Sequence, residues 1–111
     1  MIEKIILDYL SSVLTVGCYM ERPEQKPETY IIIEKTGGTE TNNIKSATVA
    51  IQSYAPTLYQ TAALNEEVKE AMKNIVTLDD VSACRLNSDY NYTDTRSKEY
   101  RYQAVFNIYY Y

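Results

Sequence analysis

Carboxylates are the side chains in this sequence whose spacing comes nearest to a catalytic or metal-binding pattern. A magnesium-dependent enzyme needs two or more carboxylates that converge on one point. Asp79 and Asp80 are adjacent, but consecutive side chains in an extended turn diverge. The other neighbouring carboxylates are Asp89 with Asp94, Glu21 with Glu24, and the group Glu66, Glu67 and Glu70. We expect these groups to cap helices or face water, and we expect no metal site and no cofactor.

Nucleophilic catalysis has no better support. The sequence contains no histidine, so it lacks the usual general base and the commonest metal ligand. No serine lies in a Gly-x-Ser-x-Gly motif, and Cys18 and Cys84 form no CxxC or zinc spacing. Since no signal peptide is visible, we expect both cysteines to be free thiols of a reducing compartment. The sequence therefore favours a protein that is not an enzyme, with a small metal-dependent enzyme as the weaker alternative.

Composition directs attention to binding. The 111 residues suit one domain, residues 1–111, and the net charge of −4 does not favour a nucleic-acid-binding surface. No apolar run approaches the ~20 residues that span a bilayer, so we expect no membrane partner. There are 12 tyrosines against 1 phenylalanine, and seven of the tyrosines lie from Tyr90 onward. Such an excess suits a protein–protein surface, although tyrosine is also simply a good strand residue.

The elements that must position these side chains can be read from hydrophobic spacing. A helical period predicts one helix at residues 2–14 and a second after Pro56, with Ser53 and Thr57 as its candidate caps. The apolar stripe of the second helix is Leu64, Val68, Ala71, Met72 and Ile75.

Alternating or β-branched segments predict strands at residues 29–35, 47–55, 81–87 and 98–111, while residues 15–19 are a short strand or an extended link. Apolar groups on both faces put the strand at 29–35 near the sheet centre. Residues 36–43, whose Gly37 and Gly38 permit positive φ, and residues 87–97 are predicted loops within two hairpins. We expect an α+β two-layer sandwich, a mainly antiparallel sheet of about four to five strands with two helices packed on one face.

Several segments, taken together and in order, resemble the tail terminator family of long-tailed phages, also called tail completion or tail-to-head joining proteins. The matching segments are Glu21-Arg-Pro23, Tyr30-Ile-Ile-Ile-Glu-Lys-Thr-Gly-Gly38, Ala47-Thr-Val-Ala-Ile-Gln-Ser-Tyr-Ala55 and Tyr100-Arg-Tyr-Gln-Ala-Val105. The resemblance covers nearly the whole chain. It departs from the family at Cys18-Tyr-Met20, where such proteins often show a Val-Pro pair.

The resemblance implies a structural protein of a virion or prophage that assembles as a hexameric ring on the tail tube. Such a ring ends polymerisation of the tube and forms the surface that joins tail to head. Its partners would be further copies of the chain, the major tail tube protein and the connector or stopper protein of the head. DNA would pass through the pore without specific binding. The protein would reside in the virion tail, and in the host cytoplasm during assembly. The alternative is another neck component, such as a head-closure or stopper protein.

On this interpretation the two predicted loops contact neighbouring subunits or the tube, and Arg22 and Arg101 form ion pairs between subunits. Arg101 has Glu34 and Glu99 of its own sheet as alternative partners. Gln52 and Tyr54 point away from the Val49/Ile51 face, where they pack against a ring neighbour or face solvent. The candidate interface residues are Arg22, Gly37, Gly38, Gln52, Tyr54, Tyr90, Tyr92 and Arg101.

Overall fold

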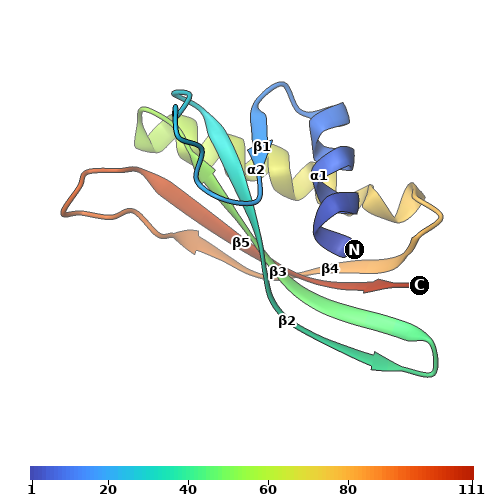
Figure 1. Cartoon of the computed structure of the whole chain (residues 1–111). Helices are drawn as coiled ribbons and strands as arrows, with labels where there is room; N and C mark the ends of the chain where they lie inside the picture. The colour runs from blue at the N-terminus through green and yellow to red at the C-terminus, as the bar shows by residue number, and fades with distance from the viewer.

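The computed structural model describes residues 1–111 as one sheet covered by two helices (Figure 1). The five strands lie in the order β1-β2-β3-β5-β4, and every neighbouring pair is antiparallel except β1 with β2. The expected α+β two-layer sandwich is therefore confirmed. The elements in chain order are α1 (Ile2–Val13), β1 (Gly17–Tyr19), β2 (Tyr30–Thr41), β3 (Ile44–Tyr54), α2 (Leu58–Lys73), the 3-10 turn η1 (Ile75–Thr77), β4 (Val81–Asn91) and β5 (Arg101–Tyr110).

The two helices are held in different ways. Helix α1 has no side-chain cap at its N-terminus, so packing of Ile2, Ile6 and Leu10 against the sheet must hold it. Helix α2 is capped by Thr57, whose hydroxyl oxygen accepts a hydrogen bond from the Gln60 N–H at 3.1 Å. The prediction of Ser53 as the alternative cap is wrong, because this residue is buried within β3.

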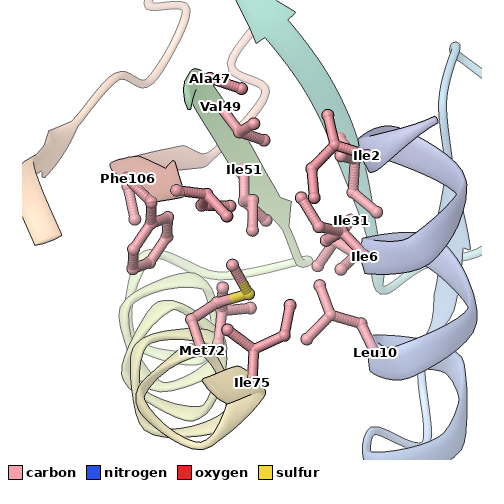
Figure 2. Close-up of a cluster of buried hydrophobic side chains, with 14 of the residues drawn as sticks. Ile2, Ile6, Leu10, Ile31, Ala47, Val49, Ile51, Met72, Ile75 and Phe106 are labelled. Carbon is pink, nitrogen blue, oxygen red and sulfur yellow. The ribbon is translucent and has the colours of Figure 1, made fainter. Parts of the chain in front are cut away.

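One core of 17 buried residues fills the space between the helices and the sheet. Figure 2 shows Val49 and Ile51 of β3 pointing into it, with Met72 of α2 below them and the side chains of α1 opposite. The period of two that predicted strand 47–55 thus selects the face that the helices cover. Each fully buried aliphatic side chain of this kind stabilises the fold by about 1.5–3 kcal/mol.

The first hairpin is longer and tighter than the sequence suggested. Strand β2 continues past a bulge between Lys35 and Gly37, and the predicted loop at 36–43 is wrong. Only Asn42 and Asn43 form the turn, with φ of 52° and 66°, the values that a two-residue hairpin turn requires. Gly37 and Gly38 are strand residues, and neither has positive φ. Glycine, threonine and asparagine resemble a loop in composition, but the register with β3 keeps them extended.

The second hairpin has the same kind of discrepancy. Strand β4 extends to Asn91, so the predicted loop at 87–97 is wrong over its first five residues, and the actual connection spans residues 92–100. Beyond Leu86 the strand is mostly exposed, and a bulge between Leu86 and Ser88 interrupts its alternation. A strand with two wet faces and a bulge has no hydrophobic period to reveal it.

Strand β2 lies beside the central strand β3, which agrees with its expected place near the sheet centre. Its apolar residues serve two faces. Ile31 and Ile33 belong to the core beneath the helices, whereas Tyr30 and Ile32 form a separate small cluster with Tyr54 on the opposite face. The outer edge of β2 pairs with β1 only at Tyr30, Ile31 and Ile32.

Helix α2 is also joined to β4 by a polar contact. One carboxylate oxygen of Asp89, Oδ2, accepts hydrogen bonds from Lys69 Nζ at 2.9 Å and from Asn65 Nδ2 at 3.0 Å. The hydrogen bond from Lys69 is the main reason that the pKa of Asp89 is lowered. Asn65 is buried, so loss of the carboxylate would leave its amide without a partner.

We expect the Asp89 contact to weaken in acid. A carboxyl group whose pKa is lowered by folding stabilises the native state above its unfolded pKa, near 3.9, and loses that contribution as pH falls through the lower folded pKa. Asp89→Asn should reduce the free energy of unfolding by about 1 kcal/mol at neutral pH, with little difference from wild type in strong acid. Urea unfolding at neutral and acidic pH measures this. An equal difference at both pH values would contradict it, and exposed Asp79→Asn is the control.

Candidate interface on the uncovered sheet face

The sheet face opposite the helices, called here the uncovered face, carries most of the residues singled out from the sequence. Register places alternate side chains of β3, β5 and β4 on this face, and no helix covers it (Figure 1). Its main polar and aromatic residues are Tyr30, Thr48, Gln52, Tyr54, Arg85, Tyr90, Arg101, Gln103 and Asn107.

Two stacked tyrosines lie at one end of this face. The rings of Tyr30 and Tyr54 are parallel within 6° and their centroids are 4.7 Å apart, while Tyr19 meets Tyr30 edge-on at 6.2 Å. Tyr30 and Tyr54 are each only 3% exposed. Contacts within the chain already bury the Tyr54 ring, so the expectation that it faces solvent is wrong. Its packing against a ring neighbour stays a prediction.

Two arginines, Arg22 and Arg101, lie against the ring of Tyr54. The Arg22 guanidinium lies 5.6 Å from the centroid of the Tyr54 ring, and its Nη2 is 2.9 Å from Glu99 Oε1. The hydrogen bond to Glu99 raises the pKa of Arg22 above its ordinary value. Arg22 thus has an ion-pair partner within its own chain.

Arg101 is held mainly by aromatic and backbone contacts. Its guanidinium lies 4.3 Å from the centroid of the Tyr92 ring, and its Nε donates a hydrogen bond to the Tyr92 carbonyl oxygen at 2.9 Å. Its Nη1 donates to the hydroxyl of Tyr54 at 3.3 Å. Neither Glu34 nor Glu99 forms an ion pair with it, which leaves the charge of Arg101 without a carboxylate partner in the chain.

A row of hydrogen bonds runs across three strands from this cluster. The Tyr54 hydroxyl donates to Gln52 Oε1 at 3.0 Å, and Gln52 Nε2 donates to Gln103 Oε1 at 2.9 Å. Gln103 Nε2 in turn donates to the hydroxyl of Tyr90 at 2.6 Å. The row fixes the orientation of amide and phenol groups on the uncovered face before any partner binds.

The outer end of the row is the part that remains accessible. Tyr90 and Tyr92 are 42% and 47% exposed, and their rings meet edge-on with centroids 5.8 Å apart. A large aromatic surface with an arginine stacked on it has the composition of an interaction surface.

The structure brings together six of the eight candidate interface residues and leaves two apart. Arg22, Gln52, Tyr54, Tyr90, Tyr92 and Arg101 belong to the cluster and row just described. Gly37 and Gly38 lie farther along β2, towards its hairpin turn. A methyl group on Gly37 would meet no atom within 4 Å, so packing inside the chain does not require glycine there.

Sequence reasoning missed two members of the cluster and row, Tyr30 and Gln103, and named Glu99 only as a partner of Arg101, whereas its ion pair is with Arg22. Successive strand residues point to opposite faces of a sheet, so Tyr30 could have been placed on the face opposite that of Ile31 from the sequence alone. Gln103 is the register partner of Gln52, and Glu99 meets Arg22 across 77 positions of sequence. Neither contact can be inferred before the strand order is known.

The chemistry available on this face is binding by stacking and hydrogen bonding. No group of three or more histidine, cysteine, aspartate or glutamate side chains is arranged to hold a metal ion. Cys18 and Cys84 are free and half-buried, and burial raises the pKa of Cys84 to about 11, so its thiol stays protonated at neutral pH. Neither α1 nor α2 has the length and the apolar run that a membrane-spanning helix needs.

Neither protein-family models nor curated protein sequences match this chain.

Proposed function

We propose that this chain is a tail terminator of a long-tailed phage or prophage, a protein that caps the tail tube as a ring and offers the head a joining surface. The observation that supports this most is a convergence. The resembling segments at 21–23, 30–38, 47–55 and 100–105 are separate in sequence, the last by more than 40 residues, yet each contributes a residue to the tyrosine–arginine cluster. Those residues are Arg22, Tyr30, Tyr54 and Arg101.

The properties of the uncovered face support assembly rather than catalysis. Tyrosine and arginine are enriched among residues that dominate binding energy at protein interfaces. Tyr90, Tyr92 and Arg101 are held by contacts within the chain, so little side-chain freedom remains to be lost on binding. The net charge of −4 is also compatible with a pore through which DNA passes without specific binding.

Tail tubes provide the direct test. Tubes polymerised from the major tail tube protein of the same phage should acquire a ring at one end and stop growing, as seen by negative-stain microscopy. Tyr90→Ala with Tyr92→Ala should reduce capping about 30-fold, as expected for hot-spot aromatic residues. Tyr59→Ala is the matched control, because Tyr59 is 84% exposed on α2, away from this face.

The result also separates two neck proteins. Uncapped tubes at saturating protein would contradict the tail terminator. Binding to filled heads but not to tubes would instead identify a head-closure or stopper protein. Circular dichroism of each variant shows whether a loss of capping comes from misfolding.

A further inference from the structure

A small pocket opens where β2 begins and β3 ends, next to the tyrosine–arginine cluster. Its volume is about 190 Å³. Prolines form part of its wall and lysine side chains line it from two loops. Its lining includes Lys26, Pro27, Tyr30, Pro56, Lys98 and Tyr100.

Tyr30 gives this pocket an unmet hydrogen-bond donor. The residue is 3% exposed, it lines the pocket, and its hydroxyl has no hydrogen-bond partner in the chain. The neighbouring Tyr54 hydroxyl, in contrast, is bonded to Gln52. Burial raises the pKa of Tyr30, so the hydroxyl keeps its proton. Buried polar groups are nearly always paired, and this one has no acceptor within the chain.

The lysines at the rim of the pocket also favour an oxygen-bearing group. Lys98 is exposed and forms no ion pair, and Lys26 reaches Glu99 only at 3.7 Å. Glu99 is already bonded to Arg22 at 2.9 Å. Glu28 is the remaining carboxylate in the wall. Two lysines and two glutamates make the wall neutral overall, and Lys98 is its ammonium group without an ion pair. Lys98 and the Tyr30 hydroxyl together suit a carboxylate beside carbonyl oxygens.

The tip of the β2–β3 hairpin is such a segment. Glu40 is exposed and forms no ion pair, and the side chains of Asn42 and Asn43 make no hydrogen bonds within the chain. Ile44 is 44% exposed and gives the tip an apolar side chain beside the turn. Pairing extends to Thr41 with Ile44, so the tip is already ordered, and Figure 1 shows it projecting beyond the helices.

We propose that this pocket receives the β2–β3 hairpin tip of a second copy of the chain, with Glu40 against Lys98 and a tip oxygen on the Tyr30 hydroxyl. Ile44 would lie against Pro27 and Pro56. Tip and pocket are at opposite ends of β2 in a molecule 44 Å long, so the contact is head-to-tail. A head-to-tail contact that closes generates a ring. The inference deepens the proposed ring and rests on it.

Charge reversal tests this contact. Glu40→Lys and Lys98→Glu should each weaken self-association by at least about tenfold, because like charges then face each other. The double variant should associate like wild type. An equimolar mixture of the two single variants should also recover, because lysine tips then enter glutamate pockets and the unchanged tips enter the unchanged pockets. Sedimentation velocity at millimolar concentration measures this, and Glu67→Lys, on the exposed side of α2, is the matched control.

Cross-linking supplies a second measurement. A carbodiimide joins carboxylates to amines in contact, and the length of β2 separates Glu40 from Lys98 within one chain. A Glu40–Lys98 cross-link is therefore intermolecular. Tyr30→Phe should weaken association about fivefold while leaving the melting temperature of the monomer no lower, since the lost hydroxyl has no partner in the monomer.

Failure of this contact is distinguishable from failure of the proposed function. Single variants that associate like wild type, a mixture that does not recover, or a chain that stays monomeric without the cross-link would each overturn the contact. If tubes are still capped in those cases, the chain remains a tail terminator whose subunits meet through a different interface. If the chain associates through this contact but does not cap tubes, the proposed contact stands and the proposed function as a tail terminator fails.

Discussion

Tyr54→Ala is expected to lower the free energy of unfolding by about 3–4 kcal/mol, the usual cost of removing a buried aromatic side chain. The ring stacks on Tyr30 and lies under the guanidinium of Arg22. Its hydroxyl donates to Gln52 and accepts from Arg101. Removal would leave a cavity and would release three side chains that now hold one another. Urea unfolding followed by circular dichroism measures the change.

Tyr54→Phe separates the contributions of ring and hydroxyl. This variant keeps the stack and should cost about 1 kcal/mol, the usual net value of a hydrogen bond. Tyr59→Ala, at an 84% exposed position, should change stability by no more than about 0.5 kcal/mol. A Tyr54→Ala protein as stable as wild type would show that the uncovered face has no core of its own. That result would also mean that Tyr54 is available for contact with a neighbouring subunit.

Ile51→Ala is expected to have a comparable effect from the opposite face, a loss of about 3–4 kcal/mol within the range for buried isoleucine. Ile51 is fully buried in the middle of β3, the central strand. Figure 2 shows its side chain between those of the two helices and β5, where little collapse can fill the space. Thermal unfolding, together with exchange of amide hydrogens in β3, measures the loss.

The adjacent residue is the natural control. Gln52→Ala changes the next side chain along β3, which points to the uncovered face and bonds Gln103. It should cost only about 1 kcal/mol, because the lost groups are half-buried hydrogen-bonding groups. Equal losses at Ile51 and Gln52 would contradict the assignment of the two faces.

The fold was predictable where hydrophobic spacing was strong. The stripe Leu64, Val68 and Met72 predicted the face of α2 that is buried, and the alternation at Val49 and Ile51 predicted the covered face of β3. These patterns persist because burial of one side of an element forces a period on its sequence. Element order and fold class follow from them.

Prediction failed where both sides of a strand are wet. The distal half of β2 and the end of β4 carry no hydrophobic period, and only pairing with a neighbouring strand keeps them extended. The candidate site could be predicted from the sequence only in part, for the same reason. Residue type drew attention to Arg22, Tyr90 and Arg101. Their contacts depend on register between strands distant in sequence, which no local pattern contains.

The strand order also governs how the chain reaches its native state. Strand β5 lies between β3 and β4, and its pairing with β3 joins Lys45 to Tyr110. The β2–β3 hairpin, closed by two asparagines, can form early because its ends are close in sequence. The core closes only when β5 arrives from far along the chain, and a large share of such distant pairings slows folding to about milliseconds or seconds. Until then, Val49 and Ile51 are open to solvent along an unpaired edge of β3, and such an edge makes an incompletely folded chain prone to aggregation.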